Sequence, residues 1–178
     1  DGPRIQEGDF VRAQITTVSR DGIAVVVGGV DTRVHLHALT FEYLVDARTK
    51  YKVGQEIMVQ VEQIIKEKDG HHIVEVNCKQ PELERAKQMR SALPIGSIVF
   101  GVVSSVTANK KVAGNINLVA YIKMYDLPVL VNNMPAKFLG SEPTRGSTVR
   151  LRVLNYLDNG MILCRCIGTQ GPMNFPNA

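Results

Sequence analysis

Arginine and histidine residues alternate over one short stretch of the chain. Arg33, His35 and His37 stand two residues apart, so on a strand their side chains would share one face. A guanidinium plane or an imidazole ring can stack on an unpaired base, and a guanidinium also contacts phosphate. The alternative for His35 is a hydrogen bond within its own domain. We expect no metal site, because the histidine pair lacks a third ligand.

Tyrosine and lysine residues are interleaved farther along the chain. Tyr121 and Tyr125 flank Lys123, and Lys110-Lys111 precede them in a polar segment. Rings for stacking and cations for phosphate are the two requirements of single-strand binding. The alternative is that one tyrosine belongs to the core and that the lysines keep the surface soluble. Together with a basic loop near residue 50, the predicted nucleic-acid-binding residues are Arg33, His35, His37, Arg48, Lys50, Lys110, Lys111, Tyr121, Lys123 and Tyr125.

No set of residues suited to catalysis is apparent. The sequence has no Gly-rich phosphate loop, no nucleophile–base pair that neighbouring strands would bring together, and no carboxylate pair in an expected cleft. We therefore predict a protein that is not an enzyme and that uses no cofactor or metal. Cys78, Cys164 and Cys166 do not make a disulfide framework. The last two should share one buried strand face, which fits a reducing, cytoplasmic compartment.

Length and charge limit what the chain can be. Its 178 residues, 44% of them hydrophobic, are enough for two small globular domains. No run approaches the ~20 apolar residues that a membrane span needs, and no signal peptide opens the chain, so no membrane partner is expected. Residues 1–80 carry a net charge of −2 and residues 95–178 a net charge of +5. A basic second half is what phosphate contact requires, although many solvated domains show the same balance.

Three landmarks recur in order along the chain, at offsets of 88, 92 and 90 residues. They are Gly8–Val18 with Gly96–Val106, Val53–Val61 with Arg145–Val153, and the turns Asp69-Gly70 and Asn159-Gly160. This repetition indicates one small β-domain used twice. Within each copy, period-two alternation and Gly-containing turns predict five short strands, for which the five-stranded OB fold is the expected architecture.

The chain is therefore predicted to be all-β, with two tandem five-stranded OB-fold barrels. The expected first barrel spans residues 5–80 and the expected second barrel spans residues 95–168. Residues 81–94 lack a strong apolar stripe and are expected to form a short helical linker rather than a core helix. A tail, residues 169–178, is expected to be extended. Val18 breaks the alternation of the first strand, which predicts a bulge there.

Residues 5–80 resemble the RNA-binding domain first described as a repeat in ribosomal protein S-one, a subfamily of the OB fold. The resemblance lies in Gly8–Val18, Gly22–Gly29, Arg33–His37 and Val53–Val61. The second copy, residues 95–168, resembles the family only through its first, fourth and fifth strands, so we interpret the chain as a tandem pair with a divergent second copy. The resemblance implies binding of single-stranded RNA on the second and third strands.

The first copy departs from the family at its stacking face. In the family, two aromatic residues of the second strand and a histidine of the third strand stack on bases. The aromatic positions align here with Asp21 and Ala24, whereas His35 matches the family histidine. Since one stacked base is worth roughly 1–3 kcal/mol, the loss of the aromatic rings matters. Arg33 could compensate by stacking its guanidinium plane on a base.

The sequence thus predicts a non-enzymatic module that binds single-stranded nucleic acid, with RNA preferred and DNA left open. The sequence also leaves open a protein partner in a larger ribonucleoprotein or other assembly. The alternative is a protein-interaction or structural OB module whose RNA-binding face has degenerated. The replaced aromatic residues and the acidic first half favour that alternative, whereas His35, the basic second half and the family resemblance favour RNA.

Overall fold

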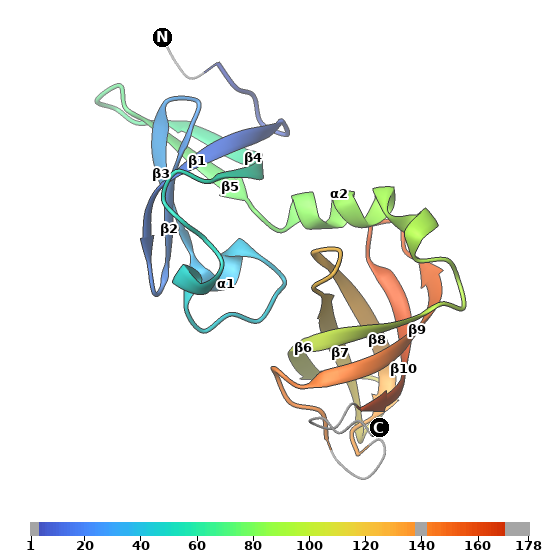
Figure 1. Cartoon of the computed structure of the whole chain (residues 1–178). Helices are drawn as coiled ribbons and strands as arrows, with labels where there is room; N and C mark the ends of the chain where they lie inside the picture. The colour runs from blue at the N-terminus through green and yellow to red at the C-terminus, as the bar shows by residue number, and fades with distance from the viewer. Residues whose placement is uncertain (1–3, 138–141, 170–178) are drawn as a thin grey trace. The chain divides into compact units, whose positions relative to one another are not determined.

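The computed structural model describes residues 4–137 and 142–169, and the chain forms two compact units (Figure 1). The first unit comprises Asp1–Thr40 and Leu44–Pro81, and the second comprises Phe41–Tyr43 and Glu82–Ala178. All but the first residue of the expected tail 169–178 lies outside the described residues. Among the described residues, no helix has the length and apolar character that crossing a membrane requires.

The first unit is a five-stranded antiparallel sheet that curls into a barrel. Its strands are β1 (Phe10–Ser19), β2 (Gly22–Val27), β3 (Val30–His35), β4 (Glu56–Lys66) and β5 (His72–Asn77). They are ordered β3-β2-β1-β4-β5, and β3 lies alongside β5. Short helical turns, α1 (Leu36–Leu39) and η1 (Ala47–Thr49), lie between β3 and β4. Alternate residues point inward, so Ala13, Val25, Val59 and their neighbours are fully buried.

The second unit is a closed barrel of the same design. Its strands are β6 (Ile98–Ala108), β7 (Asn115–Ile122), β8 (Leu127–Pro135), β9 (Thr148–Tyr156) and β10 (Ile162–Thr169). The barrel order is β10-β8-β7-β6-β9, and the parallel pair β10–β8 closes it. Each of the two units thus has the five strands of an OB fold, and the predicted all-β fold with two barrels is confirmed.

The same backbone hydrogen bonds recur in both barrels at the offsets of the sequence repeat. In the first barrel the Gly8 N–H donates to the Val61 carbonyl (2.7 Å), and in the second the Gly96 N–H donates to the Val153 carbonyl (2.8 Å). The first strands bulge at equivalent places, between Ile15 and Thr17 and 88 residues later. The predicted bulge therefore lies two to three residues before Val18, where it bends the strand around the barrel.

The helix α2 (Gln80–Gln88) and the following η2 (Arg90–Ala92) pack on the second barrel. Ala86 and Leu93 are 0% and 1% exposed and belong to the core of that barrel. The Tyr156 hydroxyl donates to the Leu93 carbonyl (2.8 Å), which fixes the end of the segment. The expectation of a linker without core contacts is therefore wrong. Ala86 and Leu93 are enough to hold this segment on the barrel, although they form no continuous apolar stripe.

The three cysteines are free and buried, as the sequence predicts. Burial raises the pKa of the Cys164 thiol to about 12 and also raises the pKa of Cys166. A thiol is nucleophilic only as a thiolate. Both cysteines are therefore inert core residues at neutral pH.

Candidate nucleic-acid interface

A groove crosses the outer surface of β1, β2 and β3 in the first barrel. Its volume is about 230 Å³, and it is lined by Thr17, Ser19, Asp21, Gly22, Ile23, Ala24, Arg33, Val34 and His35. On β2, Gly22 pairs with His35 of β3, and Ala24 pairs with Arg33. Small residues on the middle strand thus lie beside long residues on β3. This difference in side-chain size leaves a trough with an arginine and a histidine along one wall.

His35 and His37 lie together, but not through strand alternation. β3 ends at His35, and the next four residues form the turn of α1. The His37 N–H donates to Nδ1 of His35 (3.4 Å), and the two ring centroids are 4.3 Å apart. The expectation that both residues belong to one strand face is therefore corrected. A helical turn brings the two exposed rings into a tilted pair at the end of the groove.

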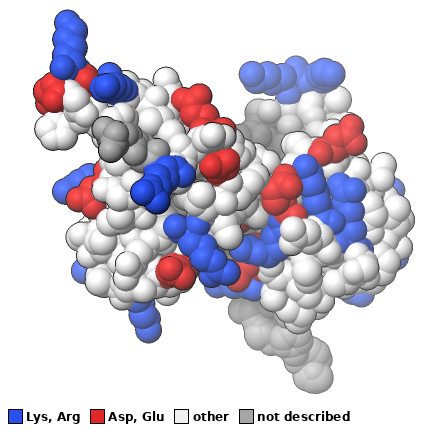
Figure 2. Space-filling view, turned by 90° about the horizontal axis from the view of Figure 1, so that it is seen from above, with Lys and Arg blue, Asp and Glu red and all other residues white. Residues whose placement is uncertain are grey.

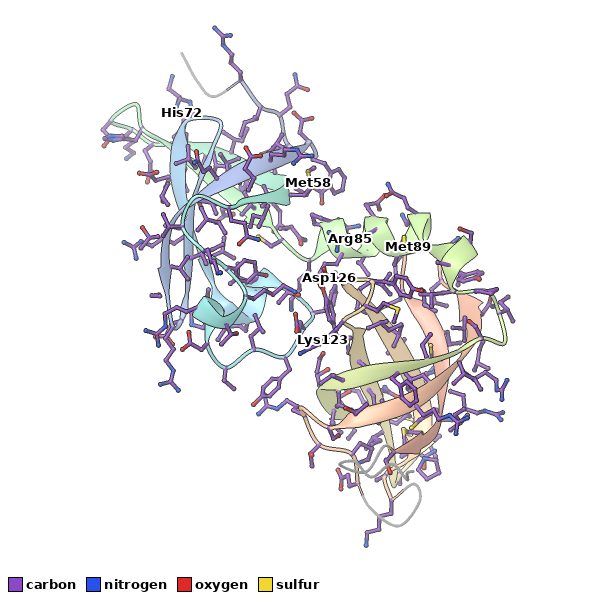
Figure 3. The ribbon with its side chains drawn as sticks, viewed as in Figure 1. Met58, His72, Arg85, Met89, Lys123 and Asp126 are labelled. Atoms are coloured by element: carbon purple, nitrogen blue, oxygen red, sulfur yellow. The ribbon has the colours of Figure 1, made fainter. Side chains whose placement is uncertain are left out.

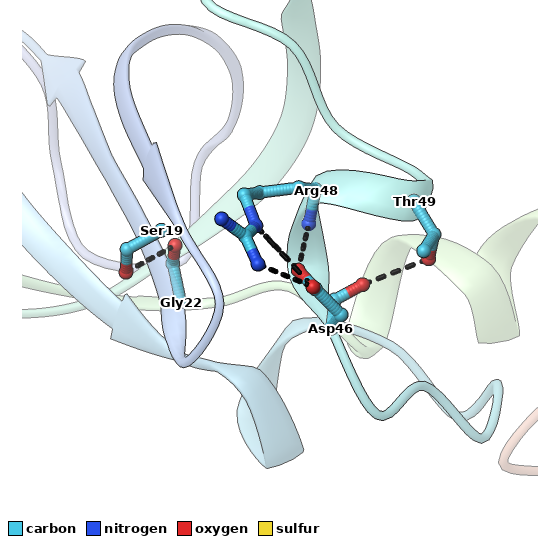
Figure 4. Close-up of polar contacts among 5 residues, drawn as sticks. All are labelled: Ser19, Gly22, Asp46, Arg48 and Thr49. Atoms are coloured by element: carbon cyan, nitrogen blue, oxygen red, sulfur yellow. Dashed lines mark hydrogen bonds and ion pairs between the residues drawn. The ribbon is translucent and has the colours of Figure 1, made fainter.

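Arg48 is bound to its neighbour Asp46 in the loop that contains η1. Nε of Arg48 donates to Oδ1 of Asp46 (3.0 Å) and Nη2 donates to Oδ2 (2.8 Å), as Figure 4 shows. This side-chain hydrogen bonding by Arg48 lowers the pKa of Asp46 to about 2. The pair therefore carries little net charge at neutral pH. Of the two loop cations that the sequence suggests, Lys50 is half-buried, whereas Arg48 is exposed but already has a partner.

A second hollow lies at the loop between β6 and β7 of the second barrel. Its volume is about 540 Å³, and it is lined by Thr107, Ala108, Asn109, Lys110, Lys111, Val112, Asn117, Asn132 and Asn133. The asparagines form a network, because Oδ1 of Asn117 accepts from Asn109 Nδ2 (3.0 Å) and from the Asn133 N–H (2.9 Å). Amide groups can donate to and accept from the edges of bases. The two lysines add positive charge at the rim.

The two hollows occupy equivalent positions in the two barrels. In the first barrel, Ser19 and Gly22 form the third pair after the bulge of the first strand. At the same place in the second barrel, Thr107 pairs with Asn117. The sequence analysis missed the asparagines. Their signal is two polar pairs, Asn115/Asn117 and Asn132/Asn133, on adjacent strands whose other residues are apolar.

The tyrosines and lysines of the second barrel do not form one site. Lys110 and Lys111 precede β7, whereas Lys123 follows it, so a strand of about 26 Å separates them. Nζ of Lys123, which Figure 3 labels, lies 3.6 Å from Oε2 of Glu42 in the 41–43 segment of the same unit. Tyr125 is half-buried against the core. Only the two lysines before β7 therefore lie at the hollow.

Tyr121 lies in the core and not on the surface. Its side chain is 1% exposed, and its hydroxyl donates to Oε2 of the buried Glu82 (2.7 Å). A base cannot reach a ring in this position. The expected stacking role of Tyr121 is therefore corrected to a structural one. The alternative that one tyrosine is a core residue describes it correctly.

Replacing Tyr121 by phenylalanine should lower stability and leave nucleic-acid affinity unchanged. The change removes a donor from a buried carboxylate, which costs about 1–3 kcal/mol, or roughly 4–8 °C in unfolding midpoint per kcal/mol. Thermal unfolding and RNA titration would measure the two effects. Tyr125→Phe is the control, since its hydroxyl has no hydrogen-bond partner among the described residues. Weaker RNA binding by a folded Tyr121→Phe protein would contradict this assignment.

Each unit has the five-stranded barrel of the OB fold, a fold that includes binders of oligonucleotides and of oligosaccharides. Residues 4–72 match the family model of the S1 RNA binding domain. The first unit is thus similar to an S1-type domain, the same domain that residues 5–80 resemble in sequence, and domains of this kind bind nucleic acid. The match ends before the second barrel, whose strands are β6–β10.

Solved structures that resemble this chain do so only distantly, in both sequence and fold. A chain of the a/eIF2alpha–aDim2p–rRNA complex from Pyrococcus horikoshii OT3 is 19% identical, with a TM-score of 0.37 over 50% of this chain and 59% of that chain. A multidomain protein with nucleic acid binding domains from Streptococcus pneumoniae TIGR4 is 13% identical, with a TM-score of 0.31 over 97% of this chain and 57% of that chain. The present chain spans less than two thirds of either matched chain. No curated protein matches it.

Proposed function

We propose that this chain binds single-stranded nucleic acid, with RNA preferred, and that it acts by binding and not by catalysis. The observation that carries the proposal is the groove over β1–β3 of the S1-type domain, where Arg33 and His35 line one wall beside Gly22 and Ala24. Small residues on the middle strand let a flat base approach the sheet. A guanidinium and an imidazole then lie beside it.

The mechanism combines stacking with phosphate contact. Arg33 stacks on a base or pairs with a phosphate, and the tilted His35–His37 pair offers two further ring faces. Phosphate attraction supplies most of the non-specific affinity of such a site, so binding should weaken steeply with salt.

The second barrel contributes its equivalent hollow. Lys110 and Lys111 attract the backbone, and the amide network around Asn117 offers donors and acceptors to base edges. A nucleic acid bound at this hollow contacts hydrogen-bonding groups. In the groove of the first barrel it contacts imidazole rings and a guanidinium plane instead. The two barrels would then hold different segments of one strand or two separate strands.

The test is fluorescence anisotropy of a labelled uridine 20-mer RNA and its DNA counterpart with the whole chain. The Arg33→Ala/His35→Ala variant should bind at least tenfold more weakly, because one lost stacking contact alone is worth about 1–3 kcal/mol. The matched control is Arg12→Ala/His71→Ala, which removes the same residue types from exposed positions outside the groove. The control should retain most of the affinity.

Two outcomes would contradict the proposal. Equal loss in the groove variant and the control would mean that net charge alone determines binding. Absence of binding to either probe at low salt would favour the alternative, a protein-interaction or structural module. The exposed Asp21 in the groove, which repels phosphate, is the observation that supports that alternative.

A further inference from the structure

An arginine-rich surface lies on a different side of the second barrel, across β6, β9 and β10. Phe100 of β6 is 53% exposed and pairs with Arg150 of β9. Next to this pair, Ile98 pairs with Arg152, and Arg152 pairs in turn with Arg165 of β10. All three arginine side chains are exposed. We call this surface, made of Ile98, Phe100, Arg150, Arg152 and Arg165, the arginine face.

The positive charge of this face is not balanced by the protein. The strands β6, β9 and β10 contain no aspartate or glutamate. Among the described residues, none of the three arginines forms an ion pair, and Arg152 makes one hydrogen bond, to the Gly96 carbonyl (3.1 Å). By contrast, Arg48 forms an ion pair with Asp46, and Arg12 forms one with Glu56. In Figure 2, blue Lys and Arg side chains lie at the right of the view with red Asp and Glu side chains beside some of them.

The spacing of the arginines brings like charges together. Directly paired residues of an antiparallel sheet have Cβ atoms about 4.5–5.5 Å apart, and diagonal neighbours about 7–8 Å. The Cβ atoms of the three arginines therefore stand within roughly 10 Å of one another. Like charges directly opposite each other, as Arg152 and Arg165 are, destabilise a sheet. A bound polyanion would relieve this repulsion.

The barrel fold itself does not require arginine at these positions. The strand pairing of the first barrel places Met58, Gln60 and Asn77 where the second barrel has Arg150, Arg152 and Arg165. These three residues are uncharged, and the first barrel forms without arginine there. The cluster therefore belongs to the second barrel alone and calls for an explanation other than folding.

We infer that the arginine face is a second contact surface for single-stranded nucleic acid, an inference that rests on the proposed function. The arginines contact successive phosphates of the nucleic acid along β9. Phe100 stacks on one base, which the nucleic acid turns toward β6. The positive charge of the three arginines favours a polyanion as the ligand. The exposed ring of Phe100 beside them favours a polyanion that carries flat bases. The face lies apart from the hollow at Asn117, which β6, β7 and β8 form. A nucleic acid bound at the hollow would thus continue around the barrel to the arginine face.

The decisive variant is Arg150→Met/Arg152→Gln/Arg165→Asn, which installs the residues of the first barrel at equivalent positions. With the labelled uridine 20-mer, it should bind at least tenfold more weakly than the unchanged chain at physiological salt. The slope of log affinity against log salt should become shallower by about 2, since each lost phosphate contact on a single strand contributes about 0.7. Phe100→Ala should weaken binding about tenfold and leave this slope unchanged.

The matched control is Arg12→Gln/Lys66→Gln/Lys68→Gln, which removes the same charge from exposed positions of the first unit. Affinity losses as large as those of the arginine variant would overturn the inference, as would an arginine variant that binds like the unchanged chain. Equally tight binding of a labelled polyglutamate would overturn it in favour of an acidic protein partner. The unfolding midpoint of the arginine variant should stay equal or rise. Arg165→Asn alone removes the like-charge pair of Arg152 and Arg165. Its RNA affinity and its unfolding midpoint should change in the same directions.

The failure of this inference and the failure of the proposed function give different results. If Arg33→Ala/His35→Ala loses binding and the arginine variant does not, the groove binds RNA and the arginine face does not. If only the arginine variant loses binding, the inference holds and the groove is not the principal site. Absence of binding by the unchanged chain would overturn both.

Discussion

Replacing Gly22 by alanine is expected to weaken RNA binding at least tenfold and to destabilise the first unit by about 1–3 kcal/mol. A methyl group at this position would collide with the Val34 carbonyl oxygen and would come within 3.2 Å of the His35 Cα. Both of these atoms belong to the backbone of β3, so the collision cannot be relieved by turning a side chain. β3 must shift away from β2 instead.

The shift would occur at the groove itself. Gly22 pairs with His35, and two residues away Ala24 pairs with Arg33. Moving β3 therefore displaces both side chains that line the groove wall and fills its floor with a methyl group. Each effect reduces the fit of a base, and a loss of 1.4 kcal/mol in binding free energy is already tenfold in affinity. RNA anisotropy and chemical denaturation of the same variant would measure the two effects.

Gly29→Ala is the control for this prediction. Gly29 lies in the turn at the other end of the same hairpin, with φ of +80° and nothing within 4 Å of an added Cβ. Alanine there costs about 1–2 kcal/mol of backbone strain without moving the groove wall. It should lower stability and keep affinity. An equal loss of RNA affinity in the Gly29 and Gly22 variants would show that general destabilisation causes it.

The strands and turns of both barrels were predictable because each depends on local chemistry. Gly8, Gly54 and Gly70 all have positive φ, as do their counterparts Gly96, Gly146 and Gly160. Only glycine adopts such a conformation without strain, so these residues mark the same turns in both copies even where the rest of the sequence diverges. Alternation then assigned the inward residues correctly, and the fold followed from the number of strands.

The candidate sites were less predictable because they depend on contacts between distant residues. Tyr121 alternates with core residues and should face outward, yet its ring is buried and its hydroxyl bonds to Glu82, which lies 39 residues earlier. His37 reaches His35 through a helical turn that no periodic pattern announces. The arginine face requires the register of β6, β9 and β10. The order of residues along the chain does not reveal how these three strands pair.

Gly160→Ala is expected to destabilise the second unit by about 2–5 kcal/mol, the sum of backbone strain and overpacking. Gly160 has φ of +102°, which disfavours alanine. Its added Cβ would also collide with the Leu83 carbonyl oxygen and lie 3.0 Å from the Leu83 carbonyl carbon. Leu83 belongs to α2, so the helix must move off the β9–β10 turn. At roughly 4–8 °C per kcal/mol, the unfolding midpoint should fall by about 8 °C or more.

Gly70→Ala isolates the contribution of the helix, because Gly70 is the equivalent residue of the first barrel. Both glycines donate their N–H to a carbonyl three residues earlier, and Gly70 has φ of +92°, but nothing lies within 4 Å of its added Cβ. Its alanine variant should therefore show only the strain of about 1–2 kcal/mol. If both variants lose the same stability, α2 contributes nothing through this contact. A larger loss for Gly160→Ala, accompanied by faster hydrogen exchange in residues 82–93, would establish that the helix stabilises the second barrel through its backbone.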